Sequence, residues 1–265
     1  TGFGRLTSIT AYREYHFESA FDAEGTAIPV QEVFITQNGK QFTQELQVAS
    51  HDTGLFVWQA GGYYFWGRDS ADPIATPLHS PDPTVAFLGN PTTFVTYTNL
   101  GTKSIASYGQ ATIELLPNTR VTAGLRYSHE NRFIVASQFG QGPFTHDALI
   151  PLAPPGSLDK SLSSSKLTYR AVLDYRFDPD TMVYVSFNRG FKSGGFNGFN
   201  PTNPAYRPEK LDAYQLGLKS QFANRSIRFN PSAFYYKYSD IQVTQITGPV
   251  PDIVNGARAE IYGID

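Results

Sequence analysis

The chain has 265 residues, a formal net charge of −2 and no cysteine. The lack of cysteine excludes disulfide scaffolds, thiolate zinc sites and iron–sulfur clusters, and the charge balance offers no basic field for nucleic acid. Mean hydropathy is −0.30, and no run reaches the ~18 consecutive apolar residues of a membrane-spanning helix. A membrane protein built from strands remains open, because such strands alternate apolar and polar residues.

Alternation with a period of two recurs along the chain and predicts an all-β protein. In residues 166–177, for example, Leu167 and Leu173 fall on one face of a strand, and Arg170 and Asp174 fall on the other. Most such segments suit the ~9–11 residues of a tilted strand that crosses a bilayer. By this test we expect about ten strands, near residues 3–16, 40–50, 55–68, 104–116, 119–137, 165–177, 181–190, 207–220, 225–240 and 258–265.

Short and long connections alternate between these strands. The short ones use turn residues, as in Pro117-Asn118 and Asp178-Pro179-Asp180. Compact soluble domains rarely carry several loops longer than ~12–15 residues, whereas outer-membrane barrels combine short periplasmic turns with long extracellular loops. We therefore expect an antiparallel transmembrane β-barrel meander, with a soluble sandwich or propeller as the alternative. The long polar stretches are 17–39, 69–103, 138–164, 191–206 and 241–257.

The alternation also predicts which face of each strand meets lipid. Leu125, Leu173 and Leu218 are expected to point outward, while Arg126, Asp174 and Lys219 point into a polar lumen. On the lumen side, Arg126, Arg170 and Arg176 are expected to pair with Asp174, with Glu114 or with a partner domain. Pro231 lies in the middle of a predicted strand, and a bulge or broken pairing is expected there, because proline cannot donate to a ladder.

Candidate chemistry is sparse. The five histidines are scattered and never occur at a metal-ligand spacing, and the acidic turns offer too few oxygens for calcium. Residues 190–195 are glycine-rich but lack the spacing and the following helix of a phosphate loop. We expect no catalytic residue, metal site or cofactor. The residues with most scope to touch a ligand lie at this strand exit: Arg189, Lys192 and Asn197 as polar contacts, with Phe191 and Phe196 beside them.

Several segments resemble the TonB-dependent outer-membrane receptors. They include TMVYVSFNRGFKSGGFN at 181–197, RPEKLDAYQLGLKSQF at 207–222 and SAFYYKYSDIQV at 232–243. The resemblance implies a barrel of about 22 strands in the outer membrane of a Gram-negative bacterium. It also implies an N-terminal plug domain inside the barrel, which contacts the TonB energising protein. Residues 1–265 are then expected to be a partial barrel domain, with the plug and the C-terminal strands outside this sequence.

The resemblance implies a transport receptor and not an enzyme. Such a receptor takes up a scarce small-molecule or metal-chelate ligand, such as a siderophore–iron complex, a vitamin or a sugar. Its other expected partners are outer-membrane lipid, its own plug and the TonB protein. Two alternatives stay open: an aromatic-rich soluble carbohydrate-binding β-domain, and a passive porin.

Overall fold

The computed structural model describes residues 4–22, 32–51, 54–78, 92–141, 150–151, 158–246 and 251–265. The described residues form strands and no helix. The strands are β1 (Arg5–Asp22), β2 (Glu32–Ala49), β3 (Phe56–Leu78), β4 (Thr92–Leu116), β5 (Thr119–Gln141), β6 (Ile150–Pro151), β7 (Lys160–Asp178), β8 (Thr181–Lys192), β9 (Glu209–Phe222), β10 (Ile227–Phe229), β11 (Ser232–Ser239), β12 (Gln242–Ile246), β13 (Pro251–Asn255) and β14 (Arg258–Ile264).

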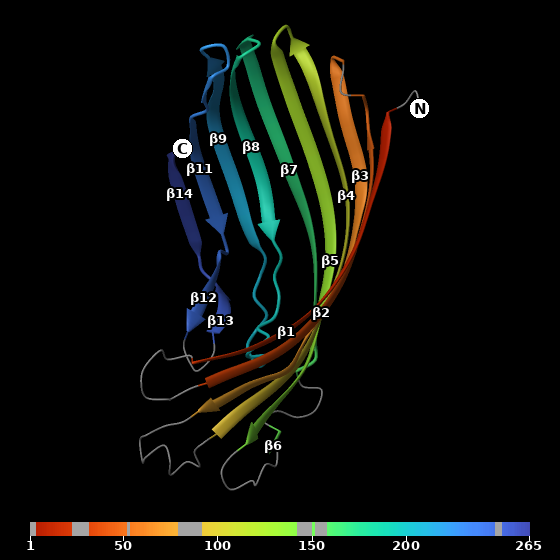
Figure 1. Ribbon diagram of the computed structural model, residues 1–265, viewed down its shortest axis with the longest axis vertical. Helices are drawn as coiled ribbons and strands as arrows, with labels where there is room; N and C mark the ends of the chain where they lie inside the picture. The colour runs from red at the N-terminus through yellow and green to blue at the C-terminus, as the bar shows by residue number, and fades with distance from the viewer. Residues whose placement is uncertain are drawn as a thin grey trace.

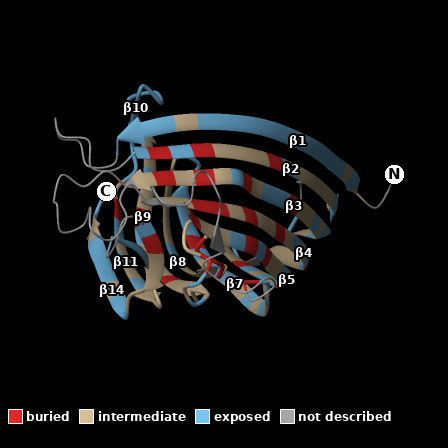
Figure 2. Ribbon diagram, turned by 90° about the horizontal axis from the view of Figure 1, so that it is seen from below, coloured by how far each residue is buried: buried red, intermediate tan, exposed pale blue. Residues whose placement is uncertain are grey.

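The strands form a curved antiparallel sheet in which sequence neighbours pair (Figure 1). Its order is β1-β2-β3-β4-β5-β7-β8-β9-β11-β14, with β6 beside β5 and β10 beside β9. The expected meander of about ten strands is confirmed. Seen end-on, the described strands trace an arc with β1 and β14 as its edges (Figure 2). The count of about 22 strands stays a prediction.

The strands extend further toward the long loops than the sequence predicts. β4 has 25 residues and begins at Thr92, within a stretch expected to be loop. Its added segment, TTFVTYTNLG, carries threonines on both faces. Apolar residues also fall on both faces, Phe94 and Leu100 on one and Val95 and Tyr97 on the other. The segment therefore has no single apolar face to mark it as a strand, although the backbone pairing continues. The expected loop 241–257 similarly contains a separate hairpin, β12–β13.

The short connections follow their turn chemistry. Asn118 adopts a φ of 64° between β4 and β5, a left-handed conformation that asparagine tolerates well. Pro231 falls in the gap between β10 and β11, so the predicted break in the strand is confirmed. Its carbonyl still accepts a hydrogen bond from the Leu218 amide at 3.0 Å, and pairing with β9 resumes at Ser232. The chain thus keeps its place in the sheet across the proline.

The two faces of the sheet differ in the predicted way. Leu125 and Leu173 are 59% and 46% exposed, whereas Asp174 is only 5% exposed. Since paired residues of antiparallel strands share a face, the register extends this division along the sheet. We call the face with Leu173 the outer face and the face with Asp174, on the inside of the arc, the inner face. No helix in the described part of the chain is long and apolar enough to cross a membrane.

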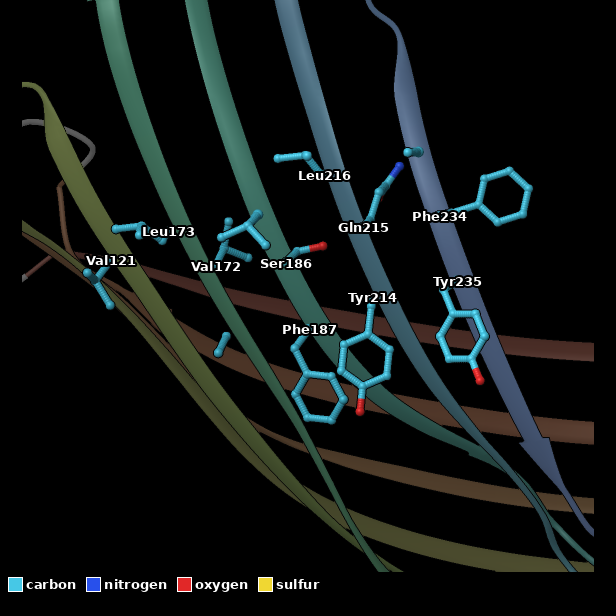
Figure 3. Close-up of a pocket in the computed structure, with 13 residues that line it drawn as sticks. Val121, Val172, Leu173, Ser186, Phe187, Tyr214, Gln215, Leu216, Phe234 and Tyr235 are labelled. Atoms are coloured by element: carbon cyan, nitrogen blue, oxygen red, sulfur yellow. The ribbon is translucent and has the colours of Figure 1, made fainter. Parts of the chain in front are cut away.

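Aromatic side chains form a row on the outer face (Figure 3). Phe187, Tyr214 and Tyr235 come from β8, β9 and β11 and lie side by side, with ring centroids 4.8 and 6.2 Å apart. Leu173 and Leu216 lie on the same face nearby. Rings with polar tips beside aliphatic residues are typical of the boundary between hydrocarbon and headgroups.

The buried core lies toward the loop-bearing end of the sheet (Figure 2). Val33, Ile35, Ala71 and Ile74 form one apolar cluster on the inner face, and Phe199 packs against it. A second cluster contains Ile134, Ala136, Leu158 and Phe196. Phe199 and Phe196 both belong to the segment after β8, residues 193–208. This segment therefore lies inside the arc rather than outside it.

Candidate functional site

The inner face of β2–β8 bears a polar hollow of about 390 Å³. Its walls combine amides, aromatic rings and both signs of charge. A surface of this kind can bind a polar ligand or a polar protein segment in the lumen. The principal side chains around it are Glu45, Gln47, Gln59, Tyr108, Gln110, Arg126, Thr168, Arg170 and Asn188.

Arg126 is the most constrained cation of this hollow. Its guanidinium carbon lies 5.4 Å from the ring centroid of Tyr63 and 5.7 Å from that of Tyr108. Its Nε donates to Ser128 Oγ at 3.2 Å, and the Tyr108 hydroxyl donates to the Glu45 carboxylate. Stacking on two rings fixes the plane of the guanidinium. Its remaining N–H groups are thereby presented in a defined orientation.

Gly61 makes this arrangement sterically feasible. A Cβ at this position would lie 2.6 Å from the Tyr108 ring and 2.7 Å from the Leu46 carbonyl oxygen. Gly61 and Tyr108 face each other directly across β3 and β4. The ring therefore lies flat over the bare backbone, in the space that a side chain would otherwise fill.

Nearer the short turns, Asp174 forms an ion pair with Arg120. The Arg120 Nε lies 3.1 Å from Asp174 Oδ1. The expectation that Asp174 pairs with Arg126, Arg170 or Arg176 is wrong, because Arg120 lies directly opposite it in the β5–β7 register. Glu114 instead accepts a hydrogen bond from the Asn118 amide at 3.2 Å. The exact hairpin register, which alternation alone does not supply, was the missing signal.

The five residues predicted to contact ligand do not converge on one site. Arg189 lies on the outer face, where it binds Asp212 through two hydrogen bonds of 2.5 and 2.8 Å. Its guanidinium carbon also lies 5.0 Å from the Tyr169 ring centroid. Phe191 has the same strand parity and shares that face. Lys192 has the opposite parity, and its exposed side chain belongs to the inner face.

Phe196 and Asn197 take part in packing inside the arc. Phe196 belongs to the cluster around Ile134. Asn197 is 5% exposed, and its side-chain amide forms two hydrogen bonds with the backbone of Ile253. The Ile253 N–H donates to Asn197 Oδ1 at 2.7 Å, and Asn197 Nδ2 donates to the Ile253 carbonyl at 3.1 Å. Phe196 and Asn197 therefore have a structural role. Ligand binding by the five residues stays a prediction.

Further contacts hold the segment after β8 to its surroundings. The Lys160 ammonium donates to the carbonyls of Pro201 and Asn203 at 2.8 and 3.2 Å. The Asn203 amide donates to the Asp252 carboxylate at 2.5 Å. Nothing in the sequence signals these contacts, because their partners are 41 to 49 positions apart. Within the described ranges, no group of three or more His, Cys, Asp and Glu residues could hold a metal ion.

Comparison with known proteins places this sheet in a family. The family model described as TonB dependent receptor-like, beta-barrel matches residues 2–265. The chain belongs to the TonB-dependent receptor β-barrel family. Members of this family are transport receptors of the Gram-negative outer membrane.

Solved structures of the family share the fold at low sequence identity. The ferric yersiniabactin uptake receptor FyuA from Yersinia pestis is 20% identical, with a TM-score of 0.75 over 98% of this chain and 36% of that one. The siderophore receptor PiuA from Acinetobacter baumannii is 16% identical, with a TM-score of 0.69 over 100% of this chain and 41% of that one. This chain thus spans well under half the length of either receptor.

Proposed function

We propose that residues 1–265 form part of the barrel wall of an outer-membrane uptake receptor. The observation that carries this proposal is the division of the same strands into an apolar outer face and a polar inner face, in a chain that matches the receptor family along its length. The outer face meets lipid, and the inner face lines a lumen. A plug domain from elsewhere in the protein occupies that lumen and contacts the TonB protein.

The proposed ligand is a small-molecule metal chelate, and the ferric siderophore class is favoured. FyuA and PiuA, which share the fold, are described as a ferric yersiniabactin uptake receptor and a siderophore receptor. The inner face supplies cations that suit an anionic chelate: Lys192 near the loop end, and Arg126 and Arg170 in the polar hollow. Arg126 and Arg170 are equally suited to carboxylates of the plug, whose displacement would open the path.

Uptake by the source bacterium tests this function. Deletion of the gene should abolish accumulation of one radiolabelled ferric siderophore under iron limitation, and the full-length gene should restore it. Loss of TonB should abolish the same uptake. Uptake that persists without TonB would indicate a passive porin, and recovery of the full-length protein in the soluble fraction without detergent would favour the soluble carbohydrate-binding alternative.

A further inference from the structure

The short-turn end of the inner face bears a second hollow, of about 400 Å³. It lies between the turn that joins β7 to β8 and the turn that joins β9 to β10, at the upper end of the sheet in Figure 1. Arg176, Met182 and Lys219 lie opposite one another on β7, β8 and β9. Arg176 has the same strand parity as Asp174, so this row belongs to the inner face. We call this space the rim hollow.

The rim hollow is rich in unpaired cations. Arg228 on β10 is opposite Gln221 on β9, which places it on the inner face, diagonally next to Lys219. Arg176, Lys219 and Arg228 all line the hollow and are exposed. None of the three forms an ion pair within the part of the chain that the structure describes. Three cations thus face a space whose volume suits a small ligand.

The acidic residues in the lining of the rim hollow do not balance this charge. Asp180 Oδ1 lies 2.7 Å from Arg225 Nε, so these two residues neutralise each other. Asp178 Oδ1 accepts a hydrogen bond from the Asp180 amide at 2.8 Å. Asp178 alone then opposes the three unpaired cations, and the hollow keeps a net positive charge that favours an anion.

Lys219 is positioned in the same way as Arg126 in the polar hollow. Its Nζ lies 5.5 Å from the centroid of the Tyr184 ring. Tyr184 is opposite Gly217, and a Cβ at Gly217 would lie 2.6 Å from that ring. The ring therefore lies over bare backbone, as Tyr108 does beneath Arg126. Both hollows thus hold a cation on a tyrosine that covers a glycine.

Unpaired cations occur at two levels along the wall formed by β5 and β7. Arg126 and Arg170 line the polar hollow, and Arg176 lines the rim hollow. Arg170 and Arg176 share the inner face of β7 and lie about 20 Å apart along the strand. Between them, Asp174 pairs with Arg120 and leaves a neutral row. The wall therefore offers two separate positions to an anion that moves along the lumen.

We propose that the rim hollow binds the carboxylate or phosphate groups of the transported ligand, as its last contact before release from the short-turn end. This inference rests on the proposed function and narrows the ligand to an anionic chelate. Arg176 and Arg228 can each bind a carboxylate through two parallel hydrogen bonds, and Lys219 adds a point charge. Two separate positions of modest affinity allow an anion to enter each and still leave it.

Charge-selective modification of a cysteine tests the field of the rim hollow. Met182→Cys places a thiol between Arg176 and Lys219, in the full-length receptor with any cysteine outside residues 1–265 replaced by serine. In nanodiscs, an anionic methanethiosulfonate should outpace a cationic one, after both rates are normalised to those of free mercaptoethanol. Arg176→Gln/Lys219→Gln/Arg228→Gln should lower this normalised ratio by about tenfold or more. Lys237→Gln, which removes a cation opposite Asp212 on the outer face, should leave the ratio unchanged.

Two further measurements test binding and the source of the anion. Citrate, used as the carboxylate probe, should slow modification of Met182→Cys, and the triple variant should lose this protection. Uptake of the radiolabelled ferric siderophore then separates the transported ligand from any other small anion. The triple variant should take up the chelate several-fold more slowly than the wild type, while it binds the chelate at the cell surface equally well.

The proposal is overturned by a normalised ratio near one in the wild type, by an equal fall in Lys237→Gln, or by a lack of protection by citrate. Unchanged uptake in the triple variant would show a site for another small anion, and a thiol that reacts with neither reagent would show a hollow filled by the plug. Either result also overturns the proposal. If the triple variant does not fold, Lys219→Gln and Arg228→Gln are measured singly, and each should lower the ratio. A wild-type receptor that takes up no siderophore counts against the proposed function, whereas the ratio and the citrate protection still decide whether the hollow binds anions.

Discussion

Leu173 and Asp174 are chain neighbours with opposite environments. Leu173 is 46% exposed among apolar residues of the outer face, while Asp174 is 5% exposed and paired with Arg120. One step along a strand exchanges lipid for lumen, because successive side chains point to opposite faces. The effect of a substitution therefore depends on which face of the sheet the residue's position along the strand gives it.

A charge placed on the outer face should be far more harmful than a lost charge on the inner face. In the complete receptor, Leu173→Arg should reduce the free energy of folding into bilayers by ~2–4 kcal/mol, the cost of arginine near the midplane. Asp174→Asn loses one ion pair but keeps a polar group facing a polar lumen. Folding into lipid vesicles, followed by heat-modifiable gel mobility, compares the two. An Asp174→Asn variant that folds worse than Leu173→Arg would reverse the assignment of the faces.

Two glycines allow a matched test of the packing of Tyr108 over Gly61. Gly61→Ala places a Cβ 2.6 Å from Tyr108, and the resulting overpacking should cost ~1–3 kcal/mol of unfolding free energy. Gly190→Ala is the control, because a Cβ there meets nothing within 4 Å. Urea unfolding of the reconstituted receptor measures both. Equal stability of the two variants would mean that Tyr108 does not lie over position 61.

At the scale of elements, the sequence predicts the middle of each strand better than its ends. The parts nearer the short turns alternate, as at 166–177, whereas the added part of β4 beginning at Thr92 carries apolar residues on both faces, Phe94 and Leu100 on one and Val95 and Tyr97 on the other. The turn at Asn118 and the break at Pro231 are predictable, because their backbone chemistry is local. The pairing of Arg120 with Asp174 and the seating of Phe196 and Phe199 depend on long-range register, which one sequence does not disclose.

The segment after β8 should loosen when its polar anchor is removed. Asn197→Ala deletes both hydrogen bonds to Ile253 and leaves a partly buried amide without its partner, at a cost of ~1–3 kcal/mol. Hydrogen exchange at the Ile253 amide should accelerate by about tenfold or more. Phe191→Ser, on the outer face, should leave this exchange rate unchanged. An unaltered rate in Asn197→Ala would show that other contacts alone hold the segment.

At the scale of the whole molecule, the described sheet is an open arc. Its edges, β1 and β14, each pair on one side only, and its outer face exposes large apolar side chains such as Leu6, Leu125 and Leu216. Unpaired strand edges and an uncovered apolar face both promote association in water. We therefore expect the stability of this arc to depend on lipid and, in the proposed barrel, on further strands beside β1 and β14.

Residues 1–265 expressed alone should aggregate in water and remain dispersed only in detergent. The physical reason is the combination of two free edges with a lipid-facing surface. Size-exclusion chromatography after refolding without detergent measures the outcome. A monodisperse soluble monomer with a cooperative thermal transition would contradict this expectation.

The assignment of lipid to the outer face and water to the inner face is the central claim, and nitroxide accessibility tests it most directly. The 265 residues contain no cysteine, so single cysteines can carry the label at Leu125 and Leu216 on the outer face, and at Gly124 and Gln215 on the inner face. In the complete receptor in bilayers, the first two labels should collide with dissolved oxygen and be shielded from a water-soluble nickel chelate. The other two should be shielded from oxygen. Inverted accessibilities, or equal accessibility of all four labels to the chelate, would contradict the account.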